Sequence, residues 1–190
     1  MNTLLSELNP VRMMVDGSAG LVVLAIHGFF LALLAKAFGD AGPSHDGRQT
    51  LNPMAHIDLF ALIGVVVAQF GWIRPMDIRS RELKGGIAGL ILVVLLALAG
   101  TWLVGRGAMA GRGLVIAITP PDLLQIAEAW LFTFARMSER IAAFNLLPVL
   151  SLTAAHALRE FLPERLRSTG AVVSGLTLVL ALAIKIWIWR

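Results

Sequence analysis

The sequence predicts an all-helical protein that crosses a membrane several times. Of its 190 residues, 57% are hydrophobic and only 15% are charged, and the mean hydropathy of +0.79 is higher than in soluble domains of this size. Several long stretches contain almost no polar side chain. A backbone inside a bilayer must satisfy its own hydrogen bonds, so we expect helices, and the alternating pattern of a membrane barrel is absent.

About five transmembrane segments are expected, and the first of them carries His27 near its middle and Lys36 near its end. The segments are predicted at residues 18–38, 58–72, 85–104, 122–150 and 171–189. The fourth is interrupted by Arg136, Glu139 and Arg140, which lie at i, i+3 and i+4 and therefore share one helix face. That face should meet another helix, water or the membrane interface rather than lipid.

Composition divides the chain into three parts. Residues 1–17 are polar and are expected to form an interfacial segment, residues 18–168 a membrane core, and residues 169–190 a C-terminal transmembrane helix. The N-terminus lacks a basic region and a signal cleavage site, so the first apolar stretch is expected to be a retained span. Lys and Arg concentrate in 74–84 and 136–167, which predicts that these segments and the N-terminus are cytoplasmic.

The charge and cysteine content exclude several classes of site. There are no cysteines, so disulfides and thiolate metal sites are ruled out. The net charge of +4 and the pI near 10.6 are typical of basic cytoplasmic loops in a membrane protein. No basic run is interleaved with stacking aromatic residues, so nucleic acid is not an expected partner. The expected partners are the lipid bilayer and another integral membrane protein or complex.

Three short segments carry a recognisable pattern. They are residues 47–58 (GRQTLNPMAHID), 71–75 (GWIRP) and 145–148 (NLLP). In this order they resemble the site-2 protease family of intramembrane zinc metalloproteases, and the resemblance extends from about residue 23 to 153. It implies a site-2 protease-like helical core, and the pattern looks like the short bacterial form, which would lie in the inner membrane as a multi-pass protein.

The catalytic motif of that family is broken in this chain. An HExxH helix binds zinc through two histidines at i and i+4, and its glutamate is the general base. The matching residues keep His27 but have Gly28 in place of the glutamate and Leu31 in place of the second histidine. The family's third ligand is an aspartate in an NxxPxPxLDG-like segment, where this chain has Thr153. The resemblance therefore implies a catalytically inactive member without zinc.

Such a protein is expected to act as a binding, accessory or assembly subunit of a larger membrane complex. Small residues in the third span, Gly85, Gly86, Gly89 and Gly100, would permit close contact with another helix. The candidate peptide- or partner-binding residues are Asn52, Pro53, His56, Asp58, Trp72, Arg74, Asn145 and Pro148.

These candidate residues also have structural interpretations. The loop at 47–58 is expected to form a turn whose His56 and Asp58 cap or brace the second helix. Trp72 and Arg74 are interpreted as a membrane-interface pair. Asn145 is expected to bond the backbone freed at the helix break before Pro148, or an incoming extended peptide.

Two alternative functions remain open. A replacement metal site would use His27, His156 and either His56 or Asp58, with Glu160 or Asp58 as the base; this alternative is an intramembrane zinc metalloprotease with a non-standard ligand set. A small transporter or lipid-binding protein would instead need a polar pathway through the spans, and the third and fifth predicted spans offer almost no residues to line one.

Overall fold

The computed structural model describes residues 9–162 and 170–188, and these residues form helices joined by irregular segments, with no strand among them. The elements are α2 (Pro10–Phe38), α3 (Gly42–His45), η1 (Pro53–Ala55), α4 (Leu59–Ala68), η2 (Ser80–Glu82), α5 (Gly86–Ala110), α6 (Arg112–Ile118), α7 (Leu124–Phe144), α8 (Ala155–Arg159) and α10 (Ala171–Ile188). Half of the expected interfacial segment and the end of the second basic segment lie outside the described residues. The division into three parts stays a prediction.

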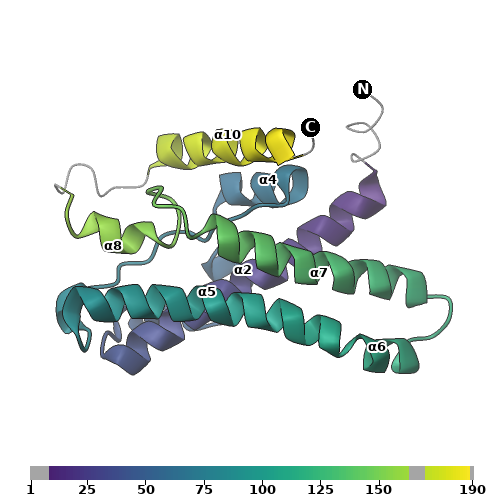
Figure 1. Ribbon diagram of the computed structural model, residues 1–190, viewed down its shortest axis with the longest axis horizontal. Helices are drawn as coiled ribbons and strands as arrows, with labels where there is room; N and C mark the ends of the chain where they lie inside the picture. Colours follow the sequence, from purple (N-terminus) through teal and green to yellow (C-terminus); the bar gives the residue numbers. More distant parts are fainter. Residues whose placement is uncertain (1–8, 163–169, 189–190) are drawn as a thin grey trace.

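Three long helices, α2, α5 and α7, pack against one another and enclose the main hydrophobic core, with α2 crossing the other two obliquely (Figure 1). Each contributes a stripe of buried apolar side chains, among them Leu31 of α2, Val93 of α5 and Ile141 of α7. Close approach of α5 and α7 depends on Gly105, because a Cβ at that position would lie 2.6 Å from the Cβ of Ser138. Such a distance is shorter than van der Waals contact, so the crossing tolerates only glycine.

A smaller layer covers one side of this bundle. Helices α4 and α10 lie side by side there (Figure 1). Their apolar faces meet Trp72 and Phe144, whose ring centroids are 6.3 Å apart, in a second buried cluster that also contains Leu152. The second layer therefore holds the segment after α4 and the chain that follows α7 against the bundle.

The prediction of about five transmembrane segments is wrong for the part of the chain that the structure describes. There, two helices, α2 and α5, are long and apolar enough to cross a membrane. The span expected at 58–72 is only the 10-residue helix α4, about 15 Å long against a hydrocarbon core of ~30 Å. The helix expected at 122–150 ends at Phe144 and is amphipathic. The two long helices and the apolar composition indicate membrane association.

Helix α2 is longer than expected because it begins at Pro10 rather than near residue 18. The side chain of Asn9 accepts a hydrogen bond of 2.9 Å from the backbone N–H of Val11, and Pro10 occupies the first helical position, where its missing N–H costs nothing. At the other end Gly39 adopts φ 122° and donates to the carbonyl of Lys36. Asn9 and Pro10, which look like a turn in the sequence, are thus a helix start.

The glycines of the third predicted span permit turns and close contacts within this chain. Gly85 and Gly86 have φ values of 87° and 61° at the start of α5, where a left-handed backbone is needed. A Cβ on Gly89 would lie 2.2 Å from the carbonyl oxygen of Lys84, and one on Gly100 would lie 3.1 Å from the ring of Phe30 in α2. The close helix contact predicted for Gly100 is therefore made with α2.

Replacing Gly105 by alanine should force α5 and α7 apart and lower the free energy of unfolding by about 1–3 kcal/mol, as other overpacked cores do. Gly107→Ala is the matched control, because a Cβ at Gly107 has no atom within 4 Å and only raises helix propensity. Thermal unfolding in detergent micelles, followed by circular dichroism, measures both. Equal stability of the two variants would contradict the tight crossing.

Candidate functional site

His27 lies at the centre of the helical bundle, fully buried, with both ring nitrogens bonded to threonine hydroxyls. Its Nδ1 is 2.9 Å from Oγ1 of Thr101 in α5, and its Nε2 is 2.8 Å from Oγ1 of Thr153. Thr101 also lies 2.8 Å from the carbonyl of Ala97, to which it can donate. A neutral imidazole has one N–H and one acceptor nitrogen, and either tautomer can be satisfied by these two hydroxyls. His27 is a hydrogen-bonded core residue.

Asn145 organises the break that ends α7. Its Nδ2 donates to the carbonyls of Gly71 at 2.8 Å and Ile141 at 2.9 Å, and its Oδ1 accepts the backbone N–H of Thr153 at 3.2 Å. The side chain is fully buried. The prediction that Asn145 bonds the freed backbone is confirmed. Pro148 is exposed in the irregular stretch between α7 and α8 and does not open a helix directly.

The three segments that carry the sequence pattern meet around His27. The backbone N–H of Arg74 donates to the carbonyl of His56 at 2.7 Å, and the guanidinium of Arg48 bonds the carbonyl of Arg74. Asn145 adds the bond to Gly71. The loop at 47–58, the segment at 71–75 and the break at 145–148 are thereby joined into one frame.

His56 fills the space beside Gly28. A Cβ built on Gly28 would lie 2.2 Å from Nδ1 of His56, so position 28 cannot carry a side chain while this ring is in place. The imidazole is buried and its Nε2 is 2.8 Å from the carbonyl of Thr50, while Nδ1 has no hydrogen-bond partner among the described residues. The proton therefore sits on Nε2, and burial lowers the pKa of His56 and keeps the ring neutral.

Both ring nitrogens of His156 lie within hydrogen-bond distance of backbone carbonyls. Its Nδ1 lies 2.8 Å from the carbonyl of Thr153 and its Nε2 3.1 Å from that of Met76. Burial, followed by the positive charge of Arg159, lowers the pKa of His156 to about 4. The ring is neutral at physiological pH, so its single N–H donates to one of the two carbonyls.

The other predicted binding residues have structural contacts. Asn52 accepts the N–H of Met54 at 3.0 Å and begins η1 at Pro53. Asp58 caps α4 through the N–H groups of Phe60 and Ala61, at 2.9 and 3.1 Å, and so braces the second helix as expected.

Trp72 and Arg74 do not form the predicted interface pair. Trp72 is fully buried in the second hydrophobic cluster, while the side chain of Arg74 is exposed. The aromatic ring therefore stabilises the core instead of facing the membrane interface.

The residues around His27 do not fit a zinc ion. The position of the second histidine is Leu31, fully buried in the hydrophobic core, and the position of the aspartate is Thr153, whose neutral hydroxyl bonds His27. Within residues 9–162 and 170–188, no group of three or more His, Cys, Asp or Glu side chains is placed to hold a metal ion. Sequence analysis missed Thr101, although a polar residue in an otherwise apolar span is a signal for a buried hydrogen bond.

Fold and site together define a helical, membrane-associated protein that keeps the frame of a zinc metalloprotease site around one histidine. Over 156 residues the chain is 30% identical to "Putative zinc metalloprotease YwhC" of Bacillus subtilis (strain 168), a match that covers 78% of this chain and 69% of the relative. The chain belongs to the same family as that protein. No family model matches the chain, and no solved structure matches it.

Thr153→Val should leave a buried nitrogen of His27 without its partner and lower the free energy of unfolding by about 1–3 kcal/mol. Thr177→Val is the control, since Thr177 is equally buried but bonds only the carbonyl of Val173 in its own helix. The difference in thermal midpoint between the two variants is the measured quantity. If Thr153→Val unfolds no earlier than Thr177→Val, the bond to His27 contributes nothing.

Proposed function

We propose that this chain is a catalytically inactive member of its zinc metalloprotease family, binds no zinc, and acts as an accessory or assembly subunit that binds another integral membrane protein. One observation carries the loss of catalysis. Both nitrogens of His27 are engaged by the hydroxyls of Thr101 and Thr153, so the remaining family ligand offers no free lone pair to a metal.

The position of the catalytic base supports the same proposal. A general base beside His27 would need a carboxylate at position 28, and the ring of His56 occupies that space. Asp58, one of the two replacement bases considered with Glu160, has Oδ1 on two backbone N–H groups and Oδ2 3.0 Å from the hydroxyl of Ser174. A carboxylate committed to a helix cap and a hydroxyl is poorly placed to deprotonate water near His27.

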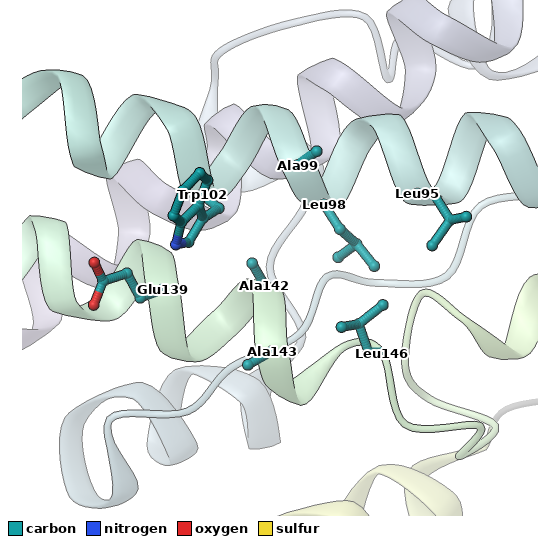
Figure 2. A pocket seen from close by; sticks show the side chains of 8 residues that line it. All are labelled: Leu95, Leu98, Ala99, Trp102, Glu139, Ala142, Ala143 and Leu146. Atoms are coloured by element: carbon teal, nitrogen blue, oxygen red, sulfur yellow. The ribbon is translucent and has the colours of Figure 1, made fainter.

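A groove between α5 and α7 supports the binding role. Its volume is about 590 Å³, and Figure 2 shows Glu139 and Trp102 at one end and Leu95 and Leu146 at the other. Three alanines, Ala99, Ala142 and Ala143, line it between the larger side chains. Small residues allow another helix backbone to approach closely.

We assign this groove to a transmembrane helix of the partner. Glu139, 3.4 Å from Arg106, gives the apolar groove one polar end, and a partner helix with a single polar or basic residue at that level would match it. The protein would then lie in the bacterial inner membrane as a multi-pass subunit.

Metal content of the detergent-purified protein tests the loss of catalysis. After growth with added zinc, we expect far less than one zinc per chain by mass spectrometry. The double variant Leu31→His with Thr153→Asp restores the family's ligand pattern around His27 and should retain zinc. A stoichiometric zinc in the unchanged protein, lost in His27→Ala, would instead establish the metalloprotease with a non-standard ligand set.

Site-specific photocrosslinking in the membrane tests the groove. A benzophenone amino acid at position 99 or 143 should give a discrete adduct with one membrane protein, because these positions face the groove. The same probe at position 179 of α10, where Val179 is 63% exposed, should not. Ala143→Trp, which fills the groove, should abolish the adduct from position 99. Equal adducts from positions 99 and 179, or an adduct that survives Ala143→Trp, would contradict the assignment.

A further inference from the structure

A second cleft lies between the first half of α7 and the start of α2. Its volume is about 480 Å³, and its lining is more polar than that of the groove in Figure 2. The residues that α7 contributes include Phe132, Thr133 and Arg136, which lie on one face of the helix because they are spaced by three and four positions. Nothing in the family resemblance assigns a role to these residues.

The floor of the cleft is a chain of polar contacts that neutralises its single carboxylate. Asp16, only 4% exposed, accepts a hydrogen bond of 3.0 Å from Nε2 of Gln69, and Nε of Arg12 lies 3.8 Å from the same carboxylate. The guanidinium of Arg140 bonds Oε1 of Gln69. The negative charge of Asp16 is thus offset by the positive charge of Arg12. Arg140, which bonds the other end of the Gln69 amide, adds a second positive charge nearby.

Arg136 adds a positive charge that no carboxylate offsets. Its guanidinium carbon lies 4.4 Å from the centroid of the Phe132 ring, and it forms no ion pair within the part of the chain that the structure describes. The two acidic residues of α7 form ion pairs with other arginines: Glu128 pairs with Arg112, and Glu139 pairs with Arg106. Stacking on Phe132 holds the guanidinium plane while leaving its N–H edge available to an anion.

The cleft lies at one end of a helix that can cross the membrane. About 30 Å of helix separates Asp16 from Lys36 at 1.5 Å per residue, which equals the thickness of the hydrocarbon core. The intervening residues of α2 include no other Asp, Glu, Lys or Arg. This length places Asp16 and the adjoining cleft at the depth of lipid headgroups. Val11, an apolar residue with 60% exposure, lines the same cleft.

We propose that this cleft binds the phosphate of an anionic phospholipid. Arg136 supplies the positive charge, the hydroxyl of Thr133 supplies a neutral donor, and Phe132 and Val11 contact the start of the acyl chains. Basic clefts between helices at headgroup depth have the chemistry that anionic lipid headgroups require. This proposal is independent of the inactive site and of the partner helix.

Native mass spectrometry of the full-length protein in detergent tests the proposal, with phosphatidylglycerol or phosphatidylcholine added. We expect preferential retention of phosphatidylglycerol, reduced about tenfold in affinity by Arg136→Gln because a charge-assisted bond to phosphate is lost. Arg81→Gln is the matched control, since Arg81 is an exposed arginine in η2, outside the cleft. Thr133→Val provides a second variant that leaves the charge unchanged and should weaken retention less.

Glycerol 3-phosphate in excess distinguishes the two sources of the phosphate. Displacement of the lipid would show that the cleft recognises the phosphate group alone, and no displacement would show that the acyl chains are required. Either result supports the phosphate site when Arg136→Gln retains less phosphatidylglycerol than the unchanged protein. Equal retention of the two lipids, or an Arg136→Gln variant that behaves like Arg81→Gln, overturns the proposal.

Discussion

The side-chain amide of Asn145 is the constraint on which the arrangement around His27 depends. A helix that breaks inside apolar surroundings leaves backbone groups without partners, and each unsatisfied group is costly where water is absent. Asn145 bonds the carbonyl of Ile141 before the break, the N–H of Thr153 after it, and the carbonyl of Gly71 in a separate segment. Because it fixes Thr153 and Gly71 together, it also sets where the hydroxyl of Thr153 meets His27 and where the segment containing Trp72 enters the core.

The side chains around His27, where the resemblance would place a zinc ion, are joined by hydrogen bonds between neutral groups. A zinc site places a divalent charge among its ligands, and its stability depends on deprotonated donors. Here the groups around His27 are two hydroxyls and an amide, all buried and all within hydrogen-bond distance of a partner. A network of this kind needs no ion to be stable, and it makes the centre of the bundle a rigid packing element.

Local chemistry was predictable from the sequence where a residue had one dominant interaction. The helical class, the capping role of Asp58 and the bonding role of Asn145 followed from backbone demands that the side chains meet. The transmembrane span predicted at 58–72 was wrong because hydropathy carries no information on backbone conformation. Gln69 adopts a left-handed conformation (φ 58°), and this ends α4. Trp72 was predicted at the membrane interface because tryptophan is often found there. It is buried instead by packing against residues such as Phe144, which is far away in the sequence.

The partners of His27 required tertiary information. Thr101 lies on a different helix and Thr153 beyond a helix break, so no spacing in the sequence connects them to His27. The same holds for the cleft beside α2, where Asp16, Gln69 and Arg140 come from three separate elements. Sequence spacing identifies residues that share a face of one helix, whereas the His27 site and the cleft each combine residues from several helices and loops.

The contact between Gly28 and His56 restricts which residues position 28 can accept in evolution. A single mutation that returned glutamate to position 28 would drive its Cβ into the imidazole ring, since the two would be 2.2 Å apart. The ring at position 56 would have to move or be replaced first, and that change would remove the bond to the carbonyl of Thr50. The order of substitutions is therefore constrained, because a side chain fits at position 28 only after the ring at position 56 has moved or been replaced.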